Sequence, residues 1–230
     1  MFIAGLCLGL QSACVMVPRD PEATLNRVHR THIVRIGAVN DPPWVVRTMG
    51  EPAGIEVGIA RDFARSMSAN PQWFWGSEGE LMNALKTFEL DMVIANLDAK
   101  TPWSKDVGLT QPYFEERFVI GVPSGQKPPA KLKGVTVSYV SDDLAAAYLT
   151  KTGAIAQAVN NVANSSGPLA APSWRLQQLG YTMTPSVLFQ EQHVIAVPPG
   201  ENGFLNRLDE FVAQHKSEIM NTVEHSEDAQ

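Results

Sequence analysis

Three groups of polar side chains each follow a segment that the sequence predicts as a β-strand. They are Asn40 with Asp41, Asn96 with Asp98, and Ser141 with Asp142. Carboxylate and amide oxygens accept hydrogen bonds, so such groups favour a cation or a polyol, and the carboxylates repel an anion. Ligands of helix-covered parallel sheets sit at the carboxyl ends of strands. The loops at residues 40–44 and 96–103 are therefore the first candidates for a binding cleft.

Other kinds of reactive site find little support. The five histidines, at positions 29, 32, 193, 215 and 225, have no paired metal-ligand spacing, and no serine nucleophile elbow is present. Both cysteines, Cys7 and Cys14, lie within the first 17 residues, so the rest of the chain has no disulfide framework or cysteine-based metal site. We expect no metal, no cofactor and no catalytic residue.

The charge balance argues against nucleic acid as a partner. The 230 residues include 18 Lys and Arg and 24 Asp and Glu, a formal net charge of −6, and the basic residues are scattered. Hydrophobic residues make up 44% and charged residues 18%, which suits a globular chain rather than a disordered one.

Residues 1–17 form the one long apolar run of the chain. This length suits the apolar region of a secretion signal better than a span of a ~30 Å bilayer, although the usual preceding basic residues are missing. A buried N-terminal helix is the alternative. Residues 10–14 (LQSAC) resemble a lipoprotein cleavage box, in which Cys14 would be lipidated, but Gln11 stands where such boxes have Leu. Residues 18–31 are expected to form a polar tether.

The hydrophobic pattern of residues 33–95 predicts alternating strands and helices. Residues 32–39 alternate apolar and polar side chains, whereas residues 54–67 space apolar side chains four apart. Ser77 and Glu80 form a capping-box pattern at the start of the next helix. Further elements are expected at 72–75, 90–95, 118–122, 135–139, 142–149, 173–179, 193–197 and 202–212. The order implies a parallel sheet covered by helices.

Five stretches carry a resemblance to a known family. They are VRIG at 34–37 leading into Pro43-Trp44, GIEV at 54–57, LKTFELDMVIA at 85–95, GLTQPY at 108–113 and LKGVTV at 132–137. In this order and spacing they resemble the family 3 extracellular solute-binding proteins, the periplasmic receptors typical of amino-acid transporters. The likeness is good over residues 33–150 and loose over the remainder.

The resemblance implies an α/β fold of the type II periplasmic binding protein kind, with ligand held between two α/β lobes. Residues 33–113 and 194–217 would form lobe 1, and residues 114–193 a shortened lobe 2. Two crossing strands near 114–118 and 191–193 would form the hinge. Residues 218–230 would be a frayed tail.

The resemblance also implies where a ligand would be held. Receptors of this family hold a ligand carboxylate with hydroxyl residues and an arginine after the last strand of lobe 1. Here Asn96 and Asp98 occupy hydroxyl positions, and Trp103 stands where the arginine is expected. This departure favours a cationic or neutral polar ligand, unless Lys100 or Lys105 compensates. The alternative is that Asp98 caps a turn and Trp103 packs on the lobe.

The first loop and the second lobe would supply the other contacts. Trp44 would stack on the ligand, with a core position as the alternative, and Asn40 or Asp41 would point into the cleft. Ser141 matches the hydroxyl of the family's turn at a helix N-terminus. Asp142 argues against an anion at this turn, or simply caps the helix.

These features predict the substrate-binding component of an ABC-type transporter. We expect an exported monomer, periplasmic or lipid-anchored, that closes on a small polar solute without catalysis and serves a membrane permease. One alternative is a periplasmic dehydratase of the cyclohexadienyl type, whose carboxylated substrate fits poorly with Trp103 in place of arginine. The other is a sensory ligand-binding module, although no output segment follows residue 212.

Overall fold

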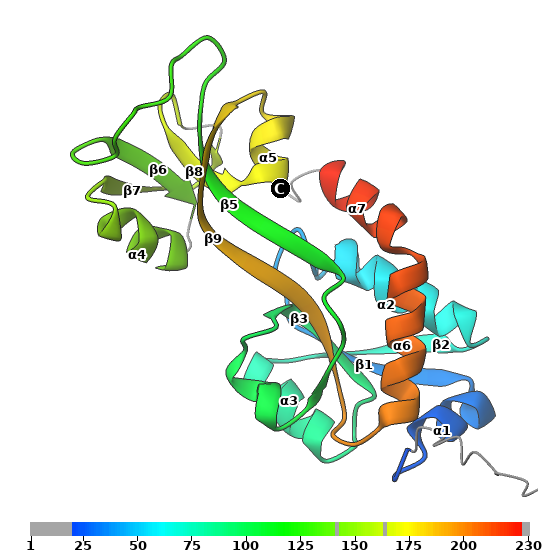
Figure 1. Cartoon of the computed structure of the whole chain (residues 1–230). Coiled ribbons are helices and arrows are strands. Elements are labelled where there is room, and N and C mark those ends of the chain that lie inside the picture. Colours follow the sequence, from blue (N-terminus) through cyan, green and yellow to red (C-terminus); the bar gives the residue numbers. More distant parts are fainter. Residues whose placement is uncertain (1–19, 141–142, 163–164, 227–230) are drawn as a thin grey trace, which may run out of the picture.

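The computed structural model describes residues 20–140, 143–162 and 165–226, which form two α/β lobes joined by a long two-stranded ribbon (Figure 1). This is the predicted fold class. The predicted signal segment, residues 1–17, and the lipidation candidate Cys14 lie outside the described residues.

Local sequence signals account for the main elements of lobe 1. They are β1 (Ile33–Ala38), α2 (Ile55–Ser66), β2 (Asn70–Trp75), α3 (Glu78–Lys86) and β3 (Met92–Asp98). β1 pairs in parallel with both β2 and β3, because each crossover helix returns the chain to the same edge. The Ser77 and Glu80 side chains each accept a hydrogen bond from the other's backbone N–H, so the predicted capping box is confirmed.

Lobe 2 is a smaller unit of the same kind. It contains β6 (Thr136–Val140), α4 (Asp143–Lys151), β7 (Ile155–Val159), β8 (Leu169–Pro172) and α5 (Ser173–Gln178). β6 lies between β7 and β8 and is parallel to both. These three strands are four or five residues long.

One nine-stranded sheet runs through both lobes within the described residues; eight strands follow the order β2-β1-β3-β9-β5-β8-β6-β7, and the ninth, β4, pairs with β9 off this path. β5 (Phe114–Val122) and β9 (Thr182–Val197) pair antiparallel and form the ribbon between the lobes. β9 then continues into lobe 1, where it pairs with β3 and with β4 (Gly108–Leu109). The hydrophobic pattern predicted a strand from His193, and the resemblance placed a hinge strand at 191–193, whereas β9 starts at Thr182.

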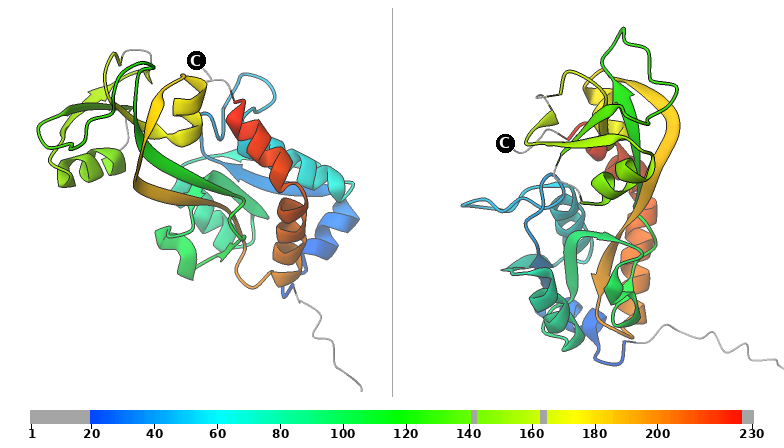
Figure 2. Two further views of the ribbon diagram at one scale, coloured as in Figure 1. Left: turned by 45° about the horizontal axis from the view of Figure 1, so that its top comes forward. Right: turned by 90° about the vertical axis from the view of Figure 1, so that its left-hand side faces the viewer.

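Helices at both ends of the chain correct two predictions. Residues 18–31 were expected to be a tether, but α1 (Thr24–Thr31) folds against lobe 1 and buries Thr24 and Val28. Residues 218–230 were expected to be frayed, but α7 (Lys216–Glu224) is helical and buries Ile219 and Val223. Both helices pack against α6 (Asn202–Gln214), which lies beside α2 (Figure 2). Tertiary contact with α6, rather than local pattern, stabilises them.

The largest hydrophobic core lies in lobe 1, between the sheet and helices α2, α6 and α7. A second cluster occupies the opposite face of the same sheet, under α3. The clusters of lobe 2 are much smaller, with four or fewer fully buried members each. Lobe 1 therefore holds most of the buried apolar surface that stabilises the fold.

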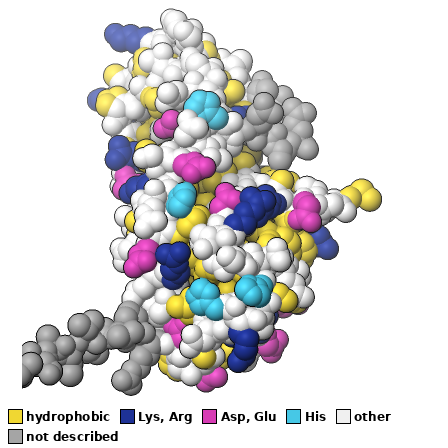
Figure 3. Space-filling model, turned by 90° about the vertical axis from the view of Figure 1, so that its right-hand side faces the viewer, with side chains coloured by type: hydrophobic (Ala, Val, Ile, Leu, Met, Phe, Trp, Pro, Cys, Tyr) yellow, Lys and Arg dark blue, Asp and Glu magenta, His cyan; other side chains and the backbone are white. Residues whose placement is uncertain are grey.

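The surface over the terminal helices carries acidic and basic side chains side by side (Figure 3). Such mixing gives no extended basic field on that face. No helix among the described residues has the length and apolarity needed to cross a bilayer.

Candidate ligand cavity between the lobes

A cavity of about 630 Å³ lies between the two lobes. Lobe 1 contributes Asp41, Trp44 and Asn96; the ribbon contributes Glu116, Phe118 and Glu191; lobe 2 contributes Asn160, Asn161, Trp174 and Arg175, among others. This volume is within the range of small-molecule sites.

The loop after β1 is fixed by its backbone and by one glycine. Asp41 and Val45 exchange two backbone hydrogen bonds of 2.7 and 2.9 Å, and the Trp44 carbonyl accepts from the Glu56 backbone N–H at 2.9 Å. Gly54 has φ +109°, and a Cβ there would lie 2.5 Å from the Trp44 carbonyl oxygen. Only glycine allows this close approach. The Trp44 ring is thereby held over His193, with ring centroids 4.1 Å apart.

A chain of hydrogen bonds leads from the cavity into the core of lobe 1. The Asn96 amide nitrogen donates to Asp41 Oδ2 at 3.0 Å, and the Asn96 backbone N–H donates to Glu56 Oε2 at 2.9 Å. Tyr113 donates its hydroxyl to Glu56 Oε1 at 2.7 Å. Asn96 has φ 52°, a left-handed conformation that asparagine tolerates. Its Oδ1 is buried with no hydrogen-bond partner among the described residues.

Burial shifts the protonation of this chain. It raises the pKa of Asp41, and the hydrogen bond from Asn96 offsets part of that rise. It also raises the pKa of the fully buried Glu56 carboxyl and raises that of the Tyr113 hydroxyl well above its ordinary value. A positive charge near Asp41 would favour its ionised form.

The face of the ribbon that borders the cavity carries a second polar group. Glu116 and Glu191 are direct partners across β5 and β9, and His193 lies two residues further along β9. The Trp174 indole donates to Glu116 Oε1 at 2.7 Å, and His193 Nε2 lies 3.5 Å from Glu116 Oε2. One ligand atom from each of the three residues lies within 4.8 Å of the other two.

A sequence model of a known protein family matches most of this chain. The model for bacterial extracellular solute-binding proteins, family 3, matches residues 34–223. The chain belongs to this family. Its members are extracellular, which indicates that the protein is exported.

Several solved structures share the fold. An ancestral cationic amino acid solute binding protein is similar with a TM-score of 0.70 and 17% identity, covering 87% of this chain and 97% of that one. The L-cystine solute receptor of Neisseria gonorrhoeae, in its unliganded open conformation, has a TM-score of 0.68 and 14% identity, covering 85% and 92%.

Curated relatives are longer proteins. The membrane-bound lytic murein transglycosylase F of Actinobacillus pleuropneumoniae serotype 5b is 28% identical over 138 residues, which are 57% of this chain and 28% of that protein. The transglycosylase F of Vibrio cholerae serotype O1 is 25% identical over 138 residues, 57% and 26%. The chain thus spans less than a third of the length of these relatives.

The structure brings some of the predicted ligand residues to the cavity. Asp41, Trp44 and Asn96 line it, although Trp44 is only 3% exposed and mostly serves the core. Asn40 does not line it, and its side-chain oxygen accepts from the Arg47 backbone at 2.7 Å. Ser141 and Asp142 lie outside the described residues. Ligand contact by these residues stays a prediction.

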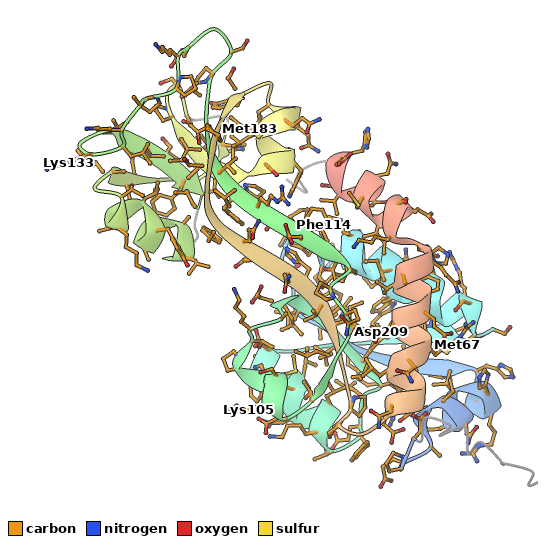
Figure 4. All side chains as sticks on the ribbon, viewed as in Figure 1. Met67, Lys105, Phe114, Lys133, Met183 and Asp209 are labelled. Atoms are coloured by element: carbon orange, nitrogen blue, oxygen red, sulfur yellow. The ribbon has the colours of Figure 1, made fainter. Side chains whose placement is uncertain are left out.

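Asp98 and Trp103 do not line the cavity. Asp98 accepts from the backbone N–H groups of Lys100 and Gln192 at 2.8 and 2.7 Å, so it caps a turn. Trp103, in a 3₁₀ turn (Pro102–Lys105), donates to Glu78 Oε1 at 2.7 Å and packs under α3. These contacts favour the alternative roles, in which Asp98 caps a turn and Trp103 packs on lobe 1. Lys105 lies at the far edge of lobe 1 (Figure 4).

The structure adds site residues that sequence reasoning missed. They are Glu116, Trp174, Arg175, Glu191 and His193. The sequence pointed to part of this set, because the predicted hinge segments contain Glu116, Glu191 and His193. Residues 114, 116 and 118 on β5 face one side of a strand, as do 189, 191 and 193 on β9. That these two sets of residues lie on the same face of the ribbon follows only from the register between β5 and β9.

Proposed function

We propose that the protein is the solute receptor of an ABC-type importer and that it binds a small amino-acid-like solute with a positive charge between its lobes. The observation that carries this proposal is the charge of the cavity lining. Asp41, Glu116 and Glu191 contribute carboxylates, while Arg175 is the one lysine or arginine in the described lining.

In this proposal the Asp41–Asn96 pair binds the ammonium or guanidinium group of the solute. Asn96 Oδ1 is a buried acceptor with no described partner, and the adjacent Asp41 carboxylate carries charge. An N–H donor that reaches both would satisfy the orphan acceptor and form a charge-assisted hydrogen bond. Arg175, across the cavity on α5, would meet a solute carboxylate. The names of the structural neighbours, which include cationic amino acid and L-cystine receptors, support an amino-acid-like solute.

Binding would close the lobes about the β5–β9 ribbon. We assign residues 33–113 and 194–217, together with α1, to lobe 1, and residues 114–193 to lobe 2. The exported protein would act as a monomer in the periplasm, or anchored there if Cys14 is lipidated, and would deliver its solute to a membrane permease.

A thermal-shift screen tests the function. The protein in EDTA-containing buffer is heated with arginine, lysine, ornithine, putrescine, glutamate and glucose. A solute at 100 times its Kd stabilises the folded state by ~2.7 kcal/mol, so a cationic amino acid should raise Tm by several degrees. A shift with glutamate and none with the cationic compounds would overturn the proposed charge preference. No shift with any compound at millimolar concentration would count against an amino-acid-like solute.

An enzyme is the second candidate, because a structural neighbour is named as a precursor of cyclohexadienyl dehydratase and the curated relatives are transglycosylases. Acid catalysis needs a carboxyl that reaches the substrate. Glu56 has a raised pKa, but both its oxygens accept hydrogen bonds and it does not line the cavity. Turnover of prephenate or of murein glycan strands, abolished by Glu116→Gln, would establish the enzyme instead.

A further inference from the structure

The ribbon presents an unfavourable arrangement of charge. Glu116 and Glu191 are direct cross-strand partners, and both border the cavity. Like charges directly opposite each other on adjacent strands destabilise a sheet. The two carboxylates therefore bring negative charge together on the cavity side of the ribbon.

His193 supplies an independent observation beside these carboxylates. Its side chain is 1% exposed, and neither ring nitrogen has a hydrogen-bond partner among the described residues. Buried polar atoms in native structures are normally paired. The Trp44 ring stacks on the imidazole, and the Trp174 indole holds Glu116 Oε1. These contacts orient Glu116 Oε2 and His193 Nε2 toward each other.

The distance between Glu116 Oε2 and His193 Nε2 distinguishes a metal ion from an ammonium group as the cation that fits between them. At 3.5 Å, the His193–Glu116 separation is too long for a direct hydrogen bond, which needs less than ~3.2 Å. Two ligands at ~2.0–2.1 Å from a tetrahedral metal lie about 3.4 Å apart. Two acceptors of one ammonium group, at ~2.8 Å each, lie about 4.6 Å apart. The 3.5 Å spacing of this pair matches two ligands of one metal ion, and a carboxylate oxygen of Glu191 lies within 4.8 Å of both.

We propose that Glu116, Glu191 and His193 bind a divalent transition metal ion of the zinc type at the ribbon. One imidazole nitrogen and two carboxylates suit a borderline cation such as Zn²⁺. Trp174 acts as the outer group that orients the Glu116 ligand. Three protein ligands leave a coordination position for water or for a donor atom of the solute, because two of the ligands border the cavity. The metal site shares the cavity of the proposed function but does not depend on it.

Isothermal titration of the EDTA-treated, dialysed protein with ZnCl₂ alone, without solute, tests the site. Wild type should bind one Zn²⁺ with a Kd in the micromolar range or tighter. Glu116→Gln, Glu191→Gln and His193→Gln should each weaken binding at least tenfold. Glu115→Gln is the matched control, since Glu115 is adjacent to Glu116 on the opposite, exposed face of β5.

X-ray absorption of the zinc-loaded wild-type protein gives a readout that does not depend on the folding of any variant. One imidazole with the remaining ligands oxygen, at ~2.0–2.2 Å, is the expected shell. No Zn²⁺ binding at millimolar concentration, a shell without imidazole, or equal weakening by Glu115→Gln would overturn the site. Because the solute screen runs in EDTA and this titration runs without solute, either proposal can fail alone.

Discussion

Two fully buried carboxylates in lobe 1 differ in how they are stabilised. Asp91 forms ion pairs with Arg27 and Arg35, and Arg35 also donates to it from its backbone N–H at 2.7 Å. Glu56 instead accepts hydrogen bonds only from the Asn96 amide and the Tyr113 hydroxyl. Hydrogen bonds alone do not restore the solvation of a buried anion, so the pKa of Glu56 is raised.

This shift predicts a pH-dependent effect of Glu56→Gln. A raised folded-state pKa means that Glu56 contributes its stability at low pH and loses it as pH rises above the ordinary 4.5 through the folded value. The unfolding free energy of wild type minus that of the variant should therefore fall from pH 4 to pH 7. Urea denaturation across this range measures it. Asp62→Asn, an exposed site on α2, is the control, and a flat difference for Glu56→Gln would contradict the prediction.

Asp41 provides a second prediction, on solute affinity. Burial raises its pKa, and a bound cation requires its ionised form, so affinity for a cationic solute should fall as pH drops through that raised value. Asp41→Asn should weaken binding about tenfold or more at neutral pH, since a hydrogen bond to a charged group contributes ~1.5–3 kcal/mol. Calorimetry at pH 7.5 and 4.5 measures both effects. Undiminished affinity of Asp41→Asn at pH 7.5 would show that Asp41 does not contact the solute charge.

At the scale of single residues, the sequence predicted Asp41, Trp44 and Asn96 of the site and missed the five others named above. Asp41 and Asn96 could be predicted because they follow segments that the sequence predicts as strands, although β3 continues through Asn96 to Asp98. Glu116 and His193 could not, because a residue inside a strand faces a cavity or solvent according to register with its partner, and residue type does not reveal that register. Asp98 has the same type and position as a ligand residue, yet its oxygens cap backbone groups.

At the scale of elements, the turn between the first loop and α2 controls the position of Trp44. Larger residues are excluded at Gly54 both by its positive φ and by the Trp44 carbonyl oxygen, which would lie 2.5 Å from an added Cβ. Four residues later, Gly58 faces open space in the same helix. The two glycines therefore have opposite roles, one required by the fold and one that only weakens the helix.

Alanine substitution should separate the two roles. Gly54→Ala should lower Tm and weaken solute binding, because it displaces the Trp44 carbonyl. Gly58→Ala should raise the unfolding free energy by up to ~1 kcal/mol, because alanine is the better helix former. Thermal denaturation of both variants measures the difference. Equal Tm values would show that the close approach at Gly54 relaxes without consequence.

The elements that the sequence missed share one physical cause. β7 and β8 fall in a stretch of small and polar residues, and α1 and α7 each bury only two side chains. Their local patterns are weak, and pairing with β6 or packing on α6 stabilises them. The helices and strands between residues 33 and 98 were found because their apolar periodicity is itself the interface with the core.

At the scale of the whole molecule, buried apolar surface is divided unequally. Lobe 1 has a continuous core on both faces of its sheet, whereas lobe 2 has small separate clusters. β7 is an edge strand, and its Ile155 is 56% exposed. Lobe 2 should therefore open locally more often than lobe 1.

Hydrogen exchange measures this difference directly. Backbone amides of β6 and β7 should exchange faster than those of β1 and β3, because opening lobe 2 exposes less apolar surface. A saturating solute should slow exchange in lobe 2 more than in lobe 1, since closure buries its cavity face. Equal protection of the two sheets in the unliganded protein would contradict the prediction.

Helix α7 adds a second joint between the lobes. Its buried residues Ile219 and Val223 belong to the lobe 1 core, while Gln178 of α5 donates to the carbonyls of Glu224 and Ser226 at 2.7 and 3.1 Å. We expect this second link to restrict rotation of lobe 2 about the ribbon axis. Opening and closing of the lobes would then be the main motion by which a solute is captured.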